Sequence, residues 1–299
     1  MPNGTIAGRV PAAASHKIRL PLVALFPAHS HGSLMNRSGS GGTLVSSSPS
    51  INRKPAMKRI LVWDLPVRLF HWFLAASFVG AFAIASLAGD ESPVFVLHML
   101  LGGVAAFMVL LRIVWGLVGT RWARFSSFAV SPKELFVYVR GALAGGGSRY
   151  TGHNPGTSLA SLLMFALVLG LAGTGVAMGS GKDVEEIHEL LAWAMVAVIG
   201  AHVAGIVWHT IRHRENIAVS MIDGRKEAEP TGAIASVRPA AALAFVLLVG
   251  LWTAGLVRGY DAASGRATLP LTGQTLQLGE GVEPEESGYG AHEEHEDDD

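Results

Sequence analysis

The amino-acid sequence predicts an all-α integral membrane protein, in which a four-helix transmembrane bundle is followed by a fifth transmembrane helix. Of the 299 residues, 50% are hydrophobic and only 15% are charged, which is too apolar for a soluble domain of this length. The mean hydropathy is +0.39. Five stretches without a charged residue are each long enough, at about 20 residues, to cross a bilayer. Several histidines lie on or beside these stretches, where burying an ionisable side chain costs free energy and usually indicates a functional role.

Residues 1–56 precede the first stretch and are rich in Ser, Gly, Pro and Ala, with no helical or alternating period. We expect this N-terminal extension to be disordered. Its basic, acid-free composition is also typical of an organellar targeting peptide, whereas two prolines interrupt the short apolar piece that resembles a cleaved signal. A third interpretation, which we prefer, is that the coding start was assigned too early and the functional chain begins at Met57.

The uncharged stretches define the expected domains. They are Leu69 to Gly89, Ser92 to Leu111, Tyr150 to Gly181, Leu190 to Ile211, and Pro239 to Val257. We expect residues 57–226 to form the four-helix transmembrane domain, residues 227–238 a cytoplasmic linker, and residues 239–258 the fifth helix. The acidic residues 259–299 are expected to form a disordered tail.

The charges that flank these stretches predict the orientation of the chain. Lys and Arg flank the first stretch on its N-terminal side, fill the segment between the second and third, and follow the fourth, whereas Asp and Glu lie in the other connections. By the positive-inside rule, the N-terminus is cytoplasmic and the acidic tail is external. Ser131-Pro132-Lys133-Glu134 matches a capping box with Pro at the first helical position, which predicts a short helix on the cytoplasmic face.

Four histidines are spaced so that they form two layers. His188 and His202 are fourteen residues apart, nearly four helical turns, so both imidazoles lie on one helix face, about 21 Å apart along the axis. His71 lies at the cytoplasmic start of the first span, and His98 near the outer start of the second. Helix direction alone then pairs His71 with His202 near the cytoplasm. It pairs His98 with His188 near the outer face.

Two facing histidines in each layer suit the axial ligation of a haem iron. The chain has no cysteine, which excludes disulfides, thiolate-bound clusters and covalent haem attachment. Each layer supplies two neutral imidazole nitrogens, one above and one below a flat macrocycle. The sequence therefore predicts two non-covalent b-type haems. Gly102, Gly103 and Gly205, each about one turn after a histidine, leave backbone surface for a porphyrin edge, although glycine also serves ordinary helix packing.

Other polar residues near the cytoplasmic boundary are candidate contacts for a cofactor. The cations that could pair with haem propionates, or else snorkel to lipid phosphates, are Arg68, Arg112, Arg212 and Arg214. His209 shares a helix face with His202 but has no partner left in its layer, so we expect a propionate or quinone contact. His153 and His213 lie in polar sequence and are expected at the surface or at a quinone headgroup. His292 and His295, in the tail, either bind a divalent metal loosely or are simply solvated.

Five motifs together carry a resemblance to a known family. They are WDLPVRLFHW, LHMLLGG, RIVWGLVGTRWARFSSF, GHNPG and HELLAWAMVAVIGAHVAGIVWHTIRHRENIAVSMIDGRK. With them, the segment from Met57 to about Lys226 resembles the bacterial di-haem cytochrome b proteins that include the b-type cytochrome subunit of nickel–iron hydrogenases, with a cytochrome b561-like transmembrane domain. The resemblance does not extend to the first 56 residues, the fifth span or the tail.

The resemblance implies a four-helix bundle that binds two b haems in the bacterial inner membrane. His98 and His188 would ligate the outer haem, and His71 and His202 the inner one. It also implies electron exchange between membrane quinone and a redox partner, such as a hydrogenase, a dehydrogenase or a c-type cytochrome. The acidic tail would dock a basic partner domain or be passive.

We therefore expect an electron-transfer subunit of an oxidoreductase rather than a stand-alone enzyme, since no acid–base pair, activated serine or phosphate loop is visible. No nucleic-acid partner is expected. The main alternative is a divalent-metal transporter that uses the intramembrane histidines and the His-containing acidic tail. Against it, the five stretches contain no carboxylate, which hard divalent cations usually require. A structural anchor without a cofactor is a further alternative.

Overall fold

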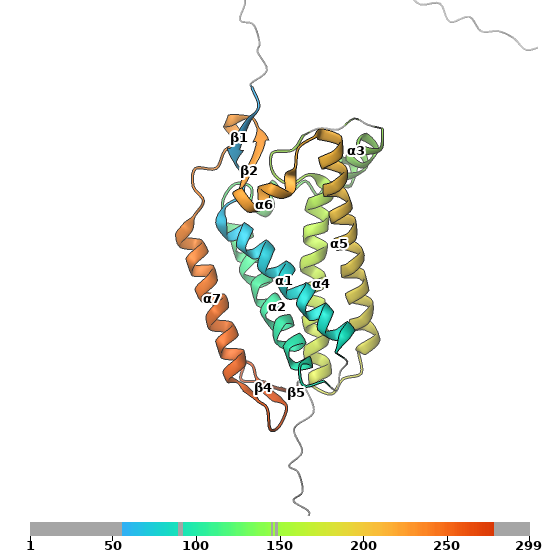
Figure 1. Ribbon diagram of the computed structural model, residues 1–299, viewed down its shortest axis with the longest axis vertical. Coiled ribbons are helices and arrows are strands. Elements are labelled where there is room, and N and C mark those ends of the chain that lie inside the picture. Colours follow the sequence, from blue (N-terminus) through green and yellow to red (C-terminus); the bar gives the residue numbers. More distant parts are fainter. Residues whose placement is uncertain (1–55, 89–91, 145, 147–148, 278–299) are drawn as a thin grey trace, which may run out of the picture. The chain divides into compact units, whose positions relative to one another are not determined.

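The computed structural model describes residues 56–88, 92–144, 146 and 149–277. The expected N-terminal extension, apart from residue 56, and residues 278–299 of the acidic tail lie outside the described residues. The described chain is mostly helical, and five of its helices are long and apolar enough to cross a membrane. The predicted fold class is thus confirmed (Figure 1).

The helices follow the predicted order. They are α1 (Leu65–Leu87), α2 (Phe95–Val118), α3 (Pro132–Leu143), α4 (Pro155–Gly179), α5 (Glu185–His213), α6 (Ser220–Asp223) and α7 (Pro239–Arg258). Short 3-10 turns occur at Phe125–Ser127, Ile217–Val219 and Pro230–Gly232. Helix α1 begins before the expected span, and α2 ends after it. In each case the helix continues through an arginine, Arg68 or Arg112, that bounds the uncharged stretch.

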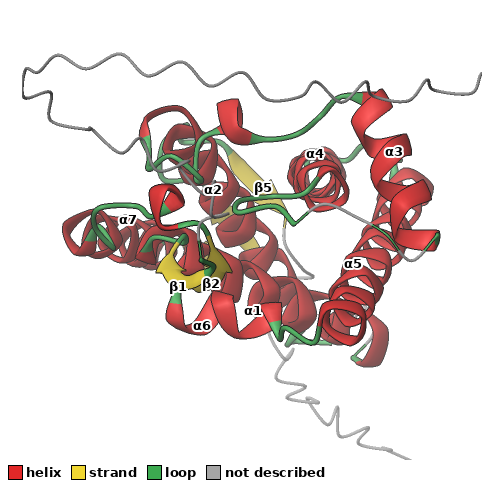
Figure 2. Ribbon diagram, turned by 90° about the horizontal axis from the view of Figure 1, so that it is seen from above, coloured by secondary structure: helices red, strands yellow, loops and turns green. Residues whose placement is uncertain are grey.

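The membrane-length helices pack as two pairs with an added fifth helix. Helix α1 packs along α2 and α4 along α5, while α2 also contacts α4; α7 packs against α1 and α2 (Figures 1 and 2). By contrast, α1 and α5 share at most marginal backbone contact among the described residues. The shared core includes Met108 of α2, Phe165 of α4, Met195 of α5 and Val249 of α7. The chain is therefore a four-helix bundle in which side chains such as Phe82 and Trp193, rather than close backbone packing, join α1 to α5, with α7 on the α1–α2 side.

The segments before α1 and after α6 are joined by a small sheet. Strand β1 (Lys58–Leu61) pairs antiparallel with β2 (Arg225–Ala228), with Lys58 opposite Ala228. The predicted linker 227–238 thus begins inside a strand. Strands of four residues are too short for an alternating pattern to predict them. The sheet ties the two ends of the four-helix unit together.

A second sheet corrects the expectation for the C-terminal tail. Strands β3 (Tyr260–Asp261), β4 (Arg266–Thr268) and β5 (Thr275–Gln277) form an antiparallel sheet in the order β3-β4-β5. Ala267 and Leu276 are buried, and Val96 and Val176 from α2 and α4 pack against them. The expectation of disorder from residue 259 onward was therefore wrong for residues 260–277. The acidic residues that suggested it lie mainly beyond residue 278.

The predicted surface helix is present as α3, with Pro132 at its start. Ser131, however, makes no side-chain capping hydrogen bond. Side-chain caps occur instead at Asp64 before α1 and Asn154 before α4. These caps fix the starts of two membrane-length helices at the end that carries β1, β2 and α3 (Figure 1).

Candidate functional site

His98 and His188 face each other at the end of the bundle that carries β4 and β5. The centroids of their rings are 6.1 Å apart and the ring planes are inclined by 64°. The His98 Nδ1 atom lies 2.8 Å from the carbonyl oxygen of Ala81 in α1. Because a carbonyl oxygen only accepts hydrogen bonds, this Nδ1 carries the proton. The Nε2 atom of His98 is therefore left with a free lone pair.

His188 is held in the same way by α4. Its Nδ1 atom lies 2.7 Å from the Thr174 hydroxyl oxygen. That hydroxyl is also 3.0 Å from the carbonyl oxygens of Gly170 and Leu171, to which its single proton is donated. The hydroxyl therefore accepts from His188, and the Nε2 atom of His188 also keeps its lone pair.

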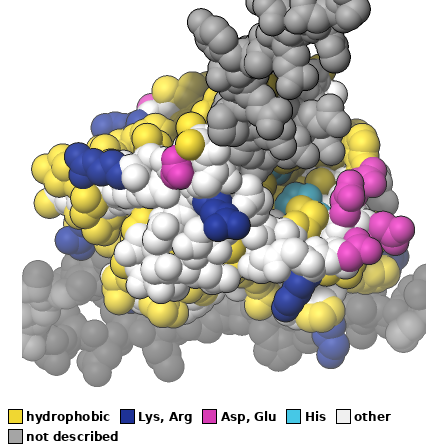
Figure 3. All heavy atoms as spheres, turned by 90° about the horizontal axis from the view of Figure 1, so that it is seen from below, with side chains coloured by type: hydrophobic (Ala, Val, Ile, Leu, Met, Phe, Trp, Pro, Cys, Tyr) yellow, Lys and Arg dark blue, Asp and Glu magenta, His cyan; other side chains and the backbone are white. Residues whose placement is uncertain are grey.

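This arrangement fits a metal ion held between the two rings. Metal-binding histidines usually donate their other ring nitrogen to a carbonyl or hydroxyl, as both residues do. Two nitrogen–metal bonds of about 2 Å, together with the distance from each nitrogen to its ring centre, separate the centroids by roughly 6 Å. Figure 3 views this end and shows histidine atoms between hydrophobic and acidic side chains.

His71 on α1 and His202 on α5 lie together at the opposite end. Each is half-buried, and the two imidazoles interact electrostatically. The Nδ1 atom of each ring is buried without a hydrogen-bond partner. The ring of His71 also packs edge-on against Trp72, at 5.1 Å between centroids. The structure thus brings the four predicted histidines together as two pairs, one at each end of the bundle.

Open space lies beside one glycine in each layer. A Cβ atom added to Gly102 or to Gly205 would meet nothing within 4 Å, whereas one added to Gly103 would lie 3.3 Å from Leu256 of α7. Gly103 therefore serves helix packing. Gly102 and Gly205 leave room on their helix faces.

Asp64 positions the start of α1 and was not among the predicted site residues. Its carboxylate is fully buried and accepts hydrogen bonds from the Val67 backbone N–H (3.0 Å), the Trp115 Nε1 (3.0 Å) and the Thr120 hydroxyl (2.7 Å). These bonds join the first turn of α1, which precedes His71, to the end of α2. An Asp followed closely by Pro at a helix start is a capping signal that could have identified it.

Arg68 and Arg112, two of the four cations expected near the cytoplasmic boundary, differ in their surroundings. The guanidinium of Arg68 donates to the carbonyl oxygen of Ile222. Arg112 is only 4% exposed, and its Nη2 donates to the Ala123 carbonyl oxygen at 3.0 Å. The Arg112 Nη1 atom is buried without a partner. Such a buried guanidinium does not reach lipid phosphates.

His209 is separate from both histidine pairs. Its ring lies 4.5 Å from that of His213, and its Nε2 atom is 3.9 Å from a Glu215 carboxylate oxygen. It lines a small cavity of about 40 Å³ together with Tyr138 and Lys226. The structure therefore places His209 among polar residues at the α3 end.

His153 is half-buried rather than fully exposed, so it departs from the surface position, which was one of its two expected locations. Its ring lies between Trp63, at 4.7 Å between centroids, and Phe128, at 4.4 Å. The Nδ1 atom is buried and has no hydrogen-bond partner. The residues of GHNP are locally polar, but aromatic side chains distant in sequence cover the imidazole. His292 and His295 lie outside the described residues.

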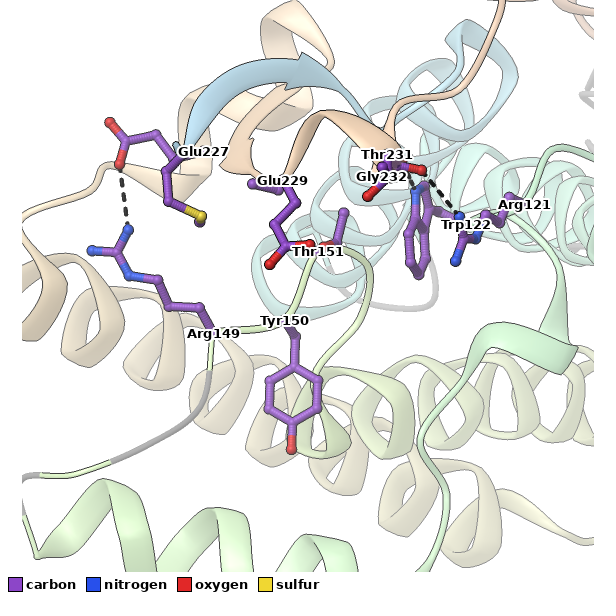
Figure 4. A pocket seen from close by; sticks show the side chains of 11 residues that line it. Arg121, Trp122, Arg149, Tyr150, Thr151, Glu227, Glu229, Thr231 and Gly232 are labelled. Atoms are coloured by element: carbon purple, nitrogen blue, oxygen red, sulfur yellow. Dashed lines mark hydrogen bonds and ion pairs between the residues drawn. The ribbon is translucent and has the colours of Figure 1, made fainter. Parts of the chain in front are cut away.

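A cavity of about 600 Å³ lies between β2 and the loops at the same end. Figure 4 shows its lining, in which Arg149 pairs with Glu227 at 3.3 Å and Trp122 donates to the Gly232 carbonyl oxygen at 2.7 Å. No histidine lines this cavity. Among the described residues, no group of three His, Asp or Glu side chains could hold a metal ion, so the metal-transport alternative gains no site there.

The fold and the paired histidines define a multi-pass membrane protein with one histidine pair at each end of its helical bundle. Residues 62–224 match the family model of prokaryotic cytochrome b561, and the chain belongs to this family, whose members bind haem. The resemblance inferred from the motifs is thus confirmed.

Curated relatives point to the same family. The chain is 26% identical over 227 residues to a protein of Bradyrhizobium diazoefficiens named "Probable Ni/Fe-hydrogenase B-type cytochrome subunit", covering 61% of this chain and 92% of the relative. A protein of Cupriavidus necator with the same name is 27% identical over 215 residues, covering 56% of this chain and 87% of the relative. No solved structure matches the chain significantly.

Proposed function

We propose that this protein is a transmembrane electron carrier that holds two b-type haems and passes electrons between a redox partner and membrane quinone. His98 and His188 would hold the outer haem, and His71 and His202 the inner one. The observation that carries the proposal is the His98–His188 pair, in which both Nδ1 atoms are occupied and the ring spacing suits a shared metal ion.

A bound haem would supply the one-electron redox couple, and the protein would supply its ligands and surroundings. The residues of this chain hold the imidazoles in place: Ala81 fixes His98, and Thr174 fixes His188. The apolar core between the pairs, with Met108 and Met195 fully buried, excludes water from the bundle interior. Ligand geometry and a dry interior are the means by which a protein sets haem potential.

The names of the relatives support a hydrogenase as the redox partner, and the membrane location supports quinone as the second partner. The flanking charges support an orientation in which β1, β2 and α3 are cytoplasmic and β3–β5 are external. The bacterial plasma membrane is the corresponding location.

A reduced-minus-oxidised absorption spectrum of the purified protein tests this function. We expect b-type haem bands and two haems per chain. His98→Ala and His202→Ala should each retain about one haem, because each removes a ligand from a different pair. His213→Ala, which changes a histidine outside both pairs, should retain two. Absence of haem from the wild-type protein would contradict the function, and two haems in His202→Ala would contradict the pairing.

A further inference from the structure

Arg112 is a buried cation that forms no ion pair within the described part of the chain. The carbon atom of its guanidinium lies over the rings of Phe125 and Phe165, at 5.5 and 5.7 Å from their centroids. One terminal nitrogen donates to the Ala123 carbonyl oxygen, and the other, Nη1, is buried without a partner. A buried charge is costly unless it is paired. The position therefore calls for an anionic group.

The carboxylate that acts electrostatically on Arg112 already accepts hydrogen bonds from other groups. Asp64 is the carboxylate whose field acts on Arg112, but it accepts its hydrogen bonds from Val67, Trp115 and Thr120 instead. Arg112 forms no salt bridge with any residue in the described part of the chain. The Nη1 donor is thus available to a group that the described part of the chain does not provide.

His153 presents a second buried polar atom without a partner in the same region. Its ring is held between Trp63 and Phe128, and its Nδ1 atom is buried without a partner. Burial first, and then the positive charges of Arg112 and Lys226, lower the pKa of His153 to about 3, so the imidazole is neutral at physiological pH. A neutral imidazole carries one N–H that can donate. His202 and Arg112 each lie within electrostatic range of His153, so His153 lies near the inner histidine pair and near Arg112.

We propose that Arg112 and His153 form a binding site for one carboxylate, a propionate of the inner haem. The Nη1 of Arg112 and the Nδ1 of His153 would each donate a hydrogen bond to it. This inference rests on the proposed function, since it requires a haem at His71 and His202. It assigns a role to His153 and selects Arg112 over Arg68 because Arg112 is only 4% exposed and its unpaired atom is a terminal nitrogen, whereas Arg68 is half-buried and its unpaired atom is Nε.

Potentiometric titration of the purified haem protein tests the site. Arg112→Gln should lower the midpoint potential of one haem, because loss of a positive charge disfavours the reduced form. We expect at least a tenfold change in its reduction equilibrium constant, about 59 mV for one electron. Arg112→Lys should restore most of the change. The control is Arg124→Gln, which removes an exposed arginine and should leave both potentials unchanged.

A second pair of variants tests His153 independently. His153→Phe keeps the aromatic packing but removes the donor, so it should lower the potential of the same haem. His153→Gln, which keeps an N–H donor, should shift it less. Wild-type potentials for both haems in Arg112→Gln and in His153→Phe would overturn the site while leaving the proposed function intact. Absence of haem from the wild-type protein would instead overturn the proposed function, and this inference with it.

Discussion

His98 and His188 face each other across the bundle at 6.1 Å between ring centroids, and each is anchored by a helix other than its own. His98 of α2 donates to Ala81 of α1, and His188 of α5 donates to Thr174 of α4. All four helices of the bundle thus contribute to one site. A change in an anchor should therefore affect the site without removing a ligand.

Thr174→Val tests this relationship because it removes the hydroxyl and keeps the shape of the side chain. Loss of the hydrogen bond to His188 should weaken binding of one haem by roughly 10- to 100-fold, the usual effect of removing such an anchor. The measurement is haem retention per chain during dilution in detergent. The matched control is Thr253→Val on α7, whose hydroxyl donates only to the Val249 carbonyl oxygen. Equal haem loss in both variants would contradict the role of Thr174.

Gly102→Leu tests whether the space beside this helix face accommodates the cofactor. Gly102 lies one turn after His98, and a Cβ there meets nothing within 4 Å, so the substitution should not disturb the apoprotein. It should lower the content of the outer haem, because the leucine occupies the space that the porphyrin needs. Gly250→Leu on α7 is the control, since its Cβ also meets nothing within 4 Å. A haem content equal to that of the control would show that the space faces lipid.

Asp64→Ala should be strongly destabilising. The substitution removes the cap of α1 and leaves two buried donors, Trp115 Nε1 and Thr120 Oγ1, without an acceptor. The combined loss is on the order of 3 kcal/mol. Thermal unfolding in detergent measures it. Asp223→Ala, which removes a partly exposed partner of Arg59, should change stability by less than about 1 kcal/mol.

Lys226 should make the free energy of unfolding change with pH in the alkaline range. Its ammonium donates to the Tyr150 and Gly152 carbonyl oxygens, and burial lowers its pKa from 10.5 to about 8, although Glu215 opposes the shift. Between these two values the unfolded chain binds more protons than the folded one. The free energy of unfolding should therefore rise with pH across this interval, by up to about 3 kcal/mol.

The check is the thermal midpoint measured between pH 7 and pH 10.5 for the wild-type protein and Lys226→Met. The methionine has no proton to lose, so the advantage of the wild-type protein over the variant should grow as pH rises. Parallel pH profiles for the two proteins would show that Lys226 titrates at its ordinary pKa.

The sequence by itself determined the membrane helices and the relation between His188 and His202. Span length, hydropathy and helical spacing are local properties, so they can be predicted without knowledge of neighbouring segments. The opposite ends of the bundle at which His71 and His98 lie followed from helix direction alone. The placement of Arg112 inside rather than at the lipid boundary did not, because its burial depends on Phe125 and Phe165 from other segments.

Only the tertiary structure decided what surrounds the polar residues between the helices. His153 lies in a turn that reads as polar, yet Trp63 and Phe128 enclose its ring. The sheet formed by residues 260–277 likewise depends on packing against α2 and α4. Burial of a side chain is the sum of contacts from segments distant in the chain, and no local pattern records those contacts.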